Sequence, residues 1–301
     1  MNRRSAKRRG PLFERVALVG LGLIGSSLAR AIRKHRLART LVACDRDAQV
    51  RRRVRALGLA DVVEGDPRRA ARGADLVVLC TPMATYAALG AAIGPALAPG
   101  AILSDVGSVK RTALTALTPH VPAHAHLIPG HPIAGTENSG PDAGFAELFV
   151  GRWCILTPPK GAAPAAVDKV AELWRRSGMN VECMDATHHD RVLAITSHVP
   201  HLIAYTIVHT VDDLETRLKA EVIKFAASGF RDFTRVAASD PVMWRDVFLE
   251  NKDAVLETMG RLYEDIALLQ KAIRNDEGAT LQRVFERSRR IRRSIVQAKQ
   301  A

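Results

Sequence analysis

The sequence predicts an α/β domain with a mostly parallel sheet, followed by an all-α domain. Through the first 185 residues, short β-rich runs alternate with stretches of helical length. Apolar runs such as VALV and LVVLC have no polar alternation, which is typical of strands covered by helices on both faces. Beyond residue 186 the apolar residues recur at helical spacing only. This order of elements predicts two domains of different class.

The amino-terminal elements are expected between residues 13 and 185. We predict strands at 15–20, 40–45, 76–80, 101–104, 126–128, 153–157 and 181–184. Helix-length stretches lie between several of them, among them 25–35, 83–97 and 164–177. Alternation of this kind is typical of a parallel sheet with helices on both sides.

The carboxyl-terminal domain is expected at 186–301, with helical segments at 187–211, 214–228, 241–274 and 277–298. Pro241 follows Asp240, so we expect Asp240 to be the N-cap of a helix and Pro241 to be its first residue.

The charge of the chain is concentrated at its ends. The 301 residues, enough for about two domains, carry a formal net charge of +13. Residues 1–10 contribute +5 and residues 283–299 contribute +6, so the body between them is near neutral. We expect residues 1–12 to form a solvated, flexible basic arm. The net charge therefore affects solubility, and we expect no nucleic-acid partner.

Two uncharged segments imitate export or membrane signals. Residues 16–25 follow a basic start, but they contain three glycines, and residues 76–104 are broken by three prolines and three glycines. Both fit strands and turns better than a membrane helix. The cysteines at 44, 80, 154 and 183 form no C-x-x-C pair, so we expect buried free thiols in a cytoplasmic protein without a membrane partner.

A glycine-rich turn predicts a dinucleotide site. Gly20-x-Gly22-x-x-Gly25 joins an apolar strand to a helix, and Asp45 closes the next strand, 20 residues beyond Gly25. In a Rossmann-type domain such glycines allow the turn, the approach of the pyrophosphate and the packing of helix on strand. The acid binds the ribose, which favours NAD, while Arg46 leaves NADP open. The predicted cofactor contacts in this part of the chain are Gly20, Gly22, Leu23, Ile24, Gly25, Asp45, Arg46 and Thr81.

Three polar segments are candidates for the chemical site. They are 104–110 (SDVGSVK), 130–137 (GHPIAGTE) and the helical-region group of 197–201, 232–235 and 240–244. Each has a structural alternative, since Ser108 suits a helix cap and His131 suits a turn. A metal site at His188, His189, His198 and His201 is not expected, because no metal-ligand spacing is present.

Together, GLGLIGSSL, DVGSVK, HPIAGTE, SHVPH, GFRDFTR and SDPVMWRDVF resemble the prephenate/arogenate dehydrogenase family of tyrosine biosynthesis, closest to its cyclohexadienyl branch. The resemblance runs from about residue 13 to 295, which leaves no room for a fused mutase or regulatory module. It implies NAD(P)-dependent oxidative decarboxylation of prephenate or arogenate, and a homodimer formed through the helical domain.

The resemblance also assigns residues. It implies that His131 is the base for the ring hydroxyl and that Arg235 holds the ring carboxylate. It also implies that Ser108 orients His131 and contacts the cofactor. Histidine suits the role because its ordinary pKa lies near neutrality, and a guanidinium can grip a carboxylate through two hydrogen bonds. The other implied substrate contacts are Thr136, Glu137, His198, His201, Asp232 and Trp244. The resemblance leaves open whether Trp244 comes from the same subunit or from a partner subunit.

Two alternatives remain at this point. One is a two-domain dehydrogenase of the β-hydroxyacid type, although the lysine of its catalytic segment is missing from Ser197–His201. The other is a non-catalytic dinucleotide-sensing protein, which would not need His131, Ser108 and Arg235 together.

Overall fold

The computed structural model describes residues 10–136, 138–214 and 216–297. The chain divides into two compact units, one of Met1–Asp190 with Ala238–Glu250 and one of Arg191–Ala237 with Asn251–Ala301. Most of the predicted basic arm, residues 1–9, lies outside the described residues, as does Lys299. The predicted domain boundary after residue 185 stays a prediction.

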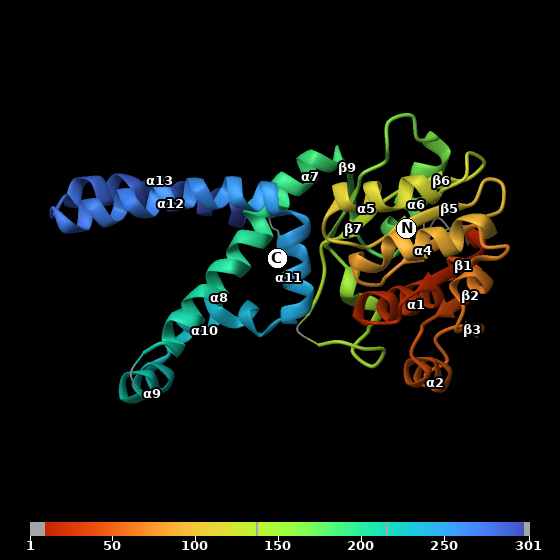
Figure 1. The fold of residues 1–301 in the computed structure, drawn as a ribbon, viewed down its shortest axis with the longest axis horizontal. Helices are drawn as coiled ribbons and strands as arrows, with labels where there is room; N and C mark the ends of the chain where they lie inside the picture. Colours follow the sequence, from red (N-terminus) through yellow and green to blue (C-terminus); the bar gives the residue numbers. More distant parts are fainter. Residues whose placement is uncertain (1–9, 137, 215, 298–301) are drawn as a thin grey trace, which may run out of the picture. The chain divides into compact units, whose positions relative to one another are not determined.

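The first unit is built on a six-stranded parallel sheet in the order β3-β2-β1-β4-β5-β6 (Figure 1). Its strands are β1 (Phe13–Val19), β2 (Ala38–Cys44), β3 (Val62–Glu64), β4 (Leu76–Leu79), β5 (Ile102–Asp105) and β6 (His126–Leu127). Val16 on β1 pairs with Leu41 on one side and Leu76 on the other, and all three are buried. From β1 the chain adds β2 and β3 on one side, and it then adds β4, β5 and β6 on the other side. Ligands of such sheets bind at the carboxyl ends of the strands, at the point between β1 and β4 where the order changes sides.

Helices cover both faces of this sheet. The α-helices are α1 (Leu23–His35), α2 (Ala48–Ala56), α3 (Pro67–Ala71), α4 (Tyr86–Ile93), α5 (Lys110–Leu117) and α6 (Pro164–Arg176). Short 3-10 turns are η1 (Met83–Thr85), η2 (Gly94–Ala96), η3 (Thr118–His120) and η4 (Ala146–Phe149). The single helix predicted at 83–97 is divided among η1, α4 and η2, the last with Pro95 in its first turn. The predicted α/β fold is confirmed.

Three further strands form a separate sheet, β7 (Gly130–Pro132), β8 (Trp153–Leu156) and β9 (Asn180–Cys183). β7 runs antiparallel to β8, and β9 runs parallel to it. The sequence predicted β8 and β9 within about one residue but not this second sheet. It also missed β3 and β7, which have three residues each and no alternation long enough to detect.

The carboxyl-terminal third is helical, as predicted. It contains α7 (Ala186–Leu193), the π-helical turn η5 (Ala194–His198), α8 (Val199–Asp212), α9 (Thr216–Phe225), α10 (Ser228–Thr234), η6 (Arg235–Ala238), α11 (Pro241–Glu250), α12 (Lys252–Arg274) and α13 (Gly278–Gln297). Asp240 caps α11, because its carboxylate accepts hydrogen bonds from the backbone of Val242 and Met243. The helix predicted at 241–274 is interrupted at Asn251, however, and α11 belongs to the first unit.

One helical stretch among the described residues, Ala186–Asp212, is long and apolar enough to cross a membrane by length and composition alone, with mean hydropathy 1.3. It includes His189, Asp190 and His198, which are buried and hydrogen-bonded to other protein groups. Buried helices of globular proteins meet the same criterion. Within this structure 28% of the apolar part of the stretch is buried, and a single stretch of this kind is weak evidence for a membrane span.

The four cysteines differ in exposure. Cys44 and Cys154 are buried as predicted, whereas Cys80 is half-buried and Cys183 is exposed, and all four are free thiols. The prediction of burial is wrong for Cys183 because β9 presents much of its surface to solvent.

Candidate active site

The glycine-rich turn follows β1 directly and leads into α1. Gly20 has a φ of +94°, and a Cβ there would lie 2.8 Å from the backbone of Cys80. A Cβ on Gly25 would lie only 2.0 Å from the carbonyl oxygen of Gly20. Both positions therefore require glycine, the first for its backbone conformation and both for close packing.

The first turn of α1 offers free backbone donors. Gly22 is the N-cap and provides no side chain to bind them, and α1 has no acidic residue in its first turn. The leading N–H groups, next to Leu23 and Ile24, therefore suit a phosphate at the positive end of the helix. Thr81 follows β4 and lies beside Gly20, with its Cγ2 2.8 Å from the position of a Gly20 Cβ. These residues fit the pyrophosphate of a dinucleotide.

Asp45 lies directly after β2 and is fixed by the backbone. Its Oδ2 accepts a hydrogen bond from the N–H of Leu21 (2.9 Å), and its Oδ1 accepts one from the N–H of Asp47 (2.9 Å). Each carboxylate oxygen retains acceptor capacity for a ribose hydroxyl. Arg46 is exposed, and its carbonyl accepts a hydrogen bond from Arg51 Nη1 (2.8 Å).

A buried ion pair lies beneath the loop that carries Ser108. Lys110 Nζ is 2.6 Å from Asp105 Oδ2 and 2.7 Å from the carbonyl oxygen of Gly130, and both side chains are fully buried. Asp105 also accepts a hydrogen bond from the hydroxyl of Tyr86 (3.0 Å). Burial lowers the pKa of Lys110, against the raising effect of Asp105. The pair fastens the carboxyl end of β5 to the start of β7.

Tyr86 and Asp105 also affect the neighbouring loop. Burial, with the nearby charge of Asp105, raises the pKa of Tyr86 well above its usual range, so the phenol stays a donor. The N–H of Gly107 donates to Asp105 Oδ2 (2.8 Å), which folds the loop back on the end of β5. Ser108, the next residue, is half-buried on this loop. The sequence contained Asp105 and Lys110 inside a candidate motif but gave them no role.

His131 is the middle residue of β7, not a turn residue. It is 8% exposed, and its backbone pairs with Ile155 on β8. Its Nδ1 lies 2.9 Å from Nε2 of His189, and Nδ1 of His189 lies 2.8 Å from Oδ1 of Asp190. The sequence pattern suggested no role for His189 beyond a metal site that is not expected, and it suggested no role for Asp190. These contacts join residues 58 positions apart, so no local pattern reveals them.

The loop after β7 packs against the cofactor helix. The N–H of Phe145 donates to Ser27 Oγ (3.1 Å), and Arg30 Nη1 donates to the carbonyl of Pro141 (3.1 Å). A Cβ on Gly144 would lie 2.2 Å from Ser26 Oγ. Thr136 is exposed on this loop, and Glu137 lies outside the described residues.

Other predicted substrate residues lie on the carboxyl-terminal helices. His198 is buried at the end of the π-helical turn, with its Nδ1 3.0 Å from the side-chain amide of Asn251. His201 is half-buried, and its Nδ1 lies 2.8 Å from the carbonyl of Ser197. Burial lowers the pKa of His201, and the charge of Arg235 lowers it further, so these two predicted residues are brought together. π-Turns of this kind occur frequently at functional sites.

The remaining predicted residues are more scattered. Asp232 and Arg235 are both exposed, Asp232 near the end of α10 and Arg235 at the start of η6. Trp244 on α11 is buried, with its ring centroid 5.5 Å from that of Phe248.

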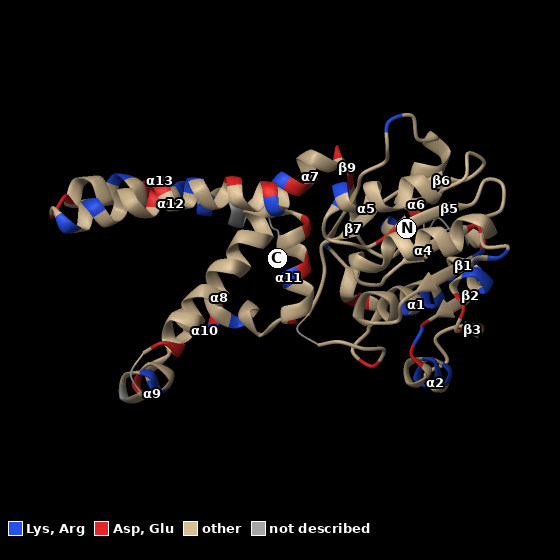
Figure 2. Ribbon diagram, viewed as in Figure 1, with Lys and Arg blue, Asp and Glu red and all other residues tan. Residues whose placement is uncertain are grey.

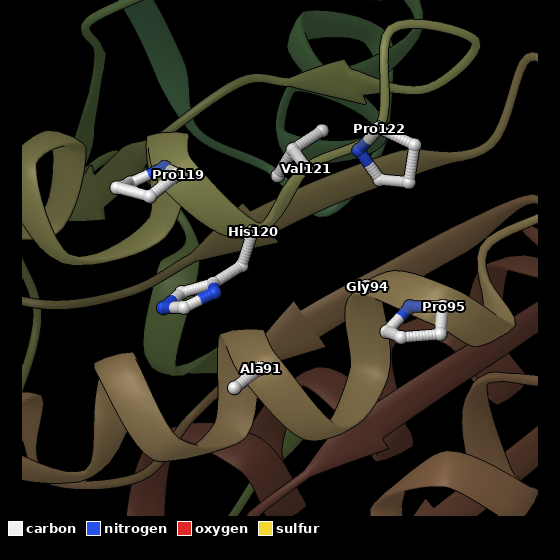
Figure 3. Close-up of a pocket in the computed structure, with 7 residues that line it drawn as sticks. All are labelled: Ala91, Gly94, Pro95, Pro119, His120, Val121 and Pro122. Carbon is white, nitrogen blue, oxygen red and sulfur yellow. The ribbon is translucent and has the colours of Figure 1, made fainter.

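A hollow of about 380 Å³ lies elsewhere on the first unit (Figure 3). It is lined by Ala91, Gly94, Pro95, Pro119, His120, Val121 and Pro122. These residues belong to the end of α4 and the connection after α5, both of which lead to the amino ends of strands. Ligands of open α/β sheets bind at the carboxyl ends, and this lining has no cation for a phosphate. The hollow is therefore not the active site.

The Gly-rich turn, the uncapped α1 and Asp45 together define a nucleotide-binding domain of an oxidoreductase. Two family models match successive parts of the chain. The nucleotide-binding domain of prephenate dehydrogenase matches residues 28–183, and its dimerization domain matches residues 185–287. The chain belongs to the prephenate dehydrogenase family, and the family predicted from the six motifs is confirmed.

Individual relatives agree. The chain is 42% identical to a cyclohexadienyl dehydrogenase of Zymomonas mobilis over 94% of its own length and 97% of the relative's. It is 31% identical to a prephenate dehydrogenase of Bacillus subtilis, over 90% of this chain and 73% of that one. A crystal structure of prephenate dehydrogenase from A. aeolicus with hydroxyphenyl propionate and NAD+ is 29% identical and superimposes with a TM-score of 0.85, covering 94% of this chain and 98% of that one.

Proposed function

We propose that the protein is a cyclohexadienyl dehydrogenase, which oxidatively decarboxylates prephenate or arogenate with NAD as the acceptor. The observation that carries the proposal is the position of His131. Its strand is fastened by Lys110 to the carboxyl end of β5. That end lies on the same edge of the sheet as the Gly-rich turn. Family membership supports the substrate class, because the relatives are prephenate, arogenate and cyclohexadienyl dehydrogenases.

His131 acts as the general base. Its imidazole accepts the proton of the ring hydroxyl as the ring carbon that bears this hydroxyl is oxidised. Bound NAD supplies the acceptor for the hydride that leaves this carbon. The ring carboxylate then departs as CO₂, its bonding electrons pass through the ring to the former hydroxyl oxygen, and this oxygen takes back the proton from His131 to give a phenol. Ser108, on the loop after β5, is proposed to bind the same hydroxyl and to orient His131.

Arg235 is proposed to bind the ring carboxylate, and Asp232 and Glu137 are proposed as acidic contacts of the substrate. His201 supports this assignment, because burial lowers its pKa and the charge of Arg235 lowers that pKa further, which favours a neutral imidazole. A neutral imidazole adds no second charge to the carboxylate site. Thr136, His198 and Trp244 are proposed to contact the rest of the substrate.

Asp45 is proposed to select NAD over NADP. A carboxylate held by the N–H groups of Leu21 and Asp47 is ready to accept ribose hydroxyl hydrogens and repels a 2′-phosphate. Arg46 is the residue that would accommodate such a phosphate.

The protein is proposed to be cytoplasmic.

The second unit is proposed to form a homodimer. Large apolar side chains are exposed along α12 at Leu256, Met259, Tyr263, Ile266 and Ile273. This three-and-four spacing forms one seam, as in paired helices, whereas Leu268, which is also exposed on α12, lies off the seam. α8 also carries a single charged residue, Asp212 (Figure 2). The family model over this region, named a dimerization domain, supports a second copy as the occupant.

The activity is tested by a spectrophotometric assay of nicotinamide reduction, with prephenate and arogenate each paired with NAD and NADP. We expect activity with NAD, and a His131→Asn variant at least about 100-fold slower. No activity in any of the four combinations would refute the enzymatic proposal.

The dimer is tested by light scattering on Ile266→Glu, with Glu264→Lys on the polar side of α12 as the control. We expect a monomer from the first variant and a dimer from the second. A dimer from both would exclude the α12 seam as the interface.

A further inference from the structure

We propose that His189 and Asp190 are positioning residues that fix the tautomer of His131, so that Nε2 of His131 is the basic nitrogen. The proposal deepens the proposed function, in which His131 is the base, and it rests on that function. It adds a buried hydrogen-bonded chain, Asp190 to His189 to His131, whose three members lie in the first unit.

The chain begins at a carboxylate that is firmly held. Oδ1 of Asp190 accepts a hydrogen bond from the N–H of Lys110 (2.8 Å), and Oδ2 accepts one from the N–H of Arg111 (3.0 Å). These donors belong to the first turn of α5, where the helix dipole also favours an anion. Asp190 is 1% exposed. Both of its oxygens therefore serve as hydrogen-bond acceptors.

The proton positions follow from this acceptor. Because Oδ1 of Asp190 cannot donate, the hydrogen between it and His189 must be on Nδ1 of His189. A neutral His189 then has a lone pair on Nε2, which accepts from Nδ1–H of His131. Neutral His131 carries one ring hydrogen, so its Nε2 has the lone pair. A base needs its lone pair on the nitrogen that meets the substrate.

The reverse arrangement requires a charged His189. Nε2 of His189 would then donate to Nδ1 of His131. The ring hydrogen of His131 would be on its own Nε2, so this nitrogen could no longer accept the substrate proton. His189 is fully buried, and burial lowers its pKa despite the hydrogen bond to Asp190. The buried ring therefore stays neutral, and the productive tautomer of His131 is favoured.

The chain also stabilises the charge that forms on His131. After Nε2 takes the substrate proton, Nδ1–H remains bound to His189, and Asp190 lies at the far end of that ring. Among the residues that the structure describes, the ionisable groups that act on His189 or on its neighbours include Lys110 and Asp105, which pair with each other, and Cys154 on β8. Burial raises the pKa of the Cys154 thiol well above its usual value, so it stays neutral. Asp190 therefore supplies the negative charge that favours the imidazolium.

Two substitutions at one position separate orientation from packing. His189→Leu fills the space but removes the acceptor for His131, whereas His189→Gln keeps an amide oxygen that can accept from Nδ1–H. We expect the Leu variant to lose at least about tenfold in kcat, and the Gln variant to recover most of it. The matched control is His188→Leu, on the exposed neighbouring position. Equal losses in the Leu and Gln variants would overturn the proposal, as would unchanged kcat in the Leu variant.

The pH profile of kcat/KM tests the role of the charge. In Asp190→Asn the acidic limb is expected to move to lower pH, because the imidazolium of His131 loses its anion. An acidic limb at the wild-type pH would contradict the role of Asp190.

Nitrogen-15 NMR of the histidines tests the tautomer without any turnover. We expect the hydrogen of His131 on Nδ1 in the wild type, with its signal assigned by loss in His131→Asn. A hydrogen on Nε2 would refute the proposal even if the enzyme is active. An inactive enzyme with the Nδ1–H tautomer would instead refute the proposed function alone.

Discussion

Replacing Lys110 with methionine tests how far the buried ion pair holds the site together. Methionine fills most of the space of the lysine chain but removes the two short contacts of Nζ, to Asp105 and to the carbonyl of Gly130. Removing one partner of a fully buried pair costs about 3–5 kcal/mol. Asp105 keeps its donors from Tyr86 and Gly107, so we expect the lower half of this range.

The cost should be visible in thermal unfolding. For a folded unit of this size, each kcal/mol lowers Tm by about 2–4 °C, so Lys110→Met is expected to melt about 6–16 °C lower. Circular dichroism at fixed pH measures the shift, and Lys160→Met, at an exposed position, is the control. A second variant, Asp105→Asn with Lys110→Met, should recover part of the loss, because no unpaired carboxylate remains. A Tm for Lys110→Met within 2 °C of the control would refute the reasoning.

Three further outcomes follow from the same geometry. Asp45→Ala should weaken NAD binding by at least about tenfold in a fluorescence titration, and should narrow the preference over NADP; an unchanged preference would contradict the role of Asp45. Arg235→Ala should raise the substrate KM by about 30- to 100-fold with the Kd of NAD unchanged, whereas equal loss of both would make the arginine structural. The pKa values of His35, His189 and His201 are lowered from 6.5, mainly by burial. The unfolded chain therefore binds more protons below about pH 6.5, so the free energy of unfolding should fall as pH decreases through 6.5; urea unfolding at pH 7.5 and 5.5 measures this, and a smaller decrease in His189→Gln checks the assignment.

The parts of the fold that could be predicted are those set by local chemistry. β1, the Gly-rich turn and α1 are defined by an apolar run, three glycines and a helical pattern within about 25 residues, and the structure has all three. Asp240 before Pro241 predicted a helix start, and its carboxylate caps α11. In these cases the residues that determine the structure are neighbours in the chain.

The features that were missed depend on distant partners. β7 has three residues and exists because His131 pairs with Ile155 on β8. The break between α11 and α12 occurs at Asn251, which is neither proline nor glycine, and whose amide contacts His198, 53 residues earlier. The pairing of His189 with His131 likewise spans 58 residues. No periodicity or spacing in one sequence encodes such contacts.

The packing of Gly144 against Ser26 limits how the cofactor preference can be redesigned. In a Rossmann-type domain the ribose binds at the end of the second strand and the pyrophosphate at the start of the first helix, so cofactor choice depends on both places. Here the first helix also supports the loop that follows His131, through Ser27 and Arg30. A larger side chain at Ser26 would push on Gly144, where a Cβ would already be only 2.2 Å from Ser26 Oγ. Changes confined to Asp45 and Arg46 leave this contact intact, so a cofactor switch made there would alter nucleotide choice without disturbing the substrate loop.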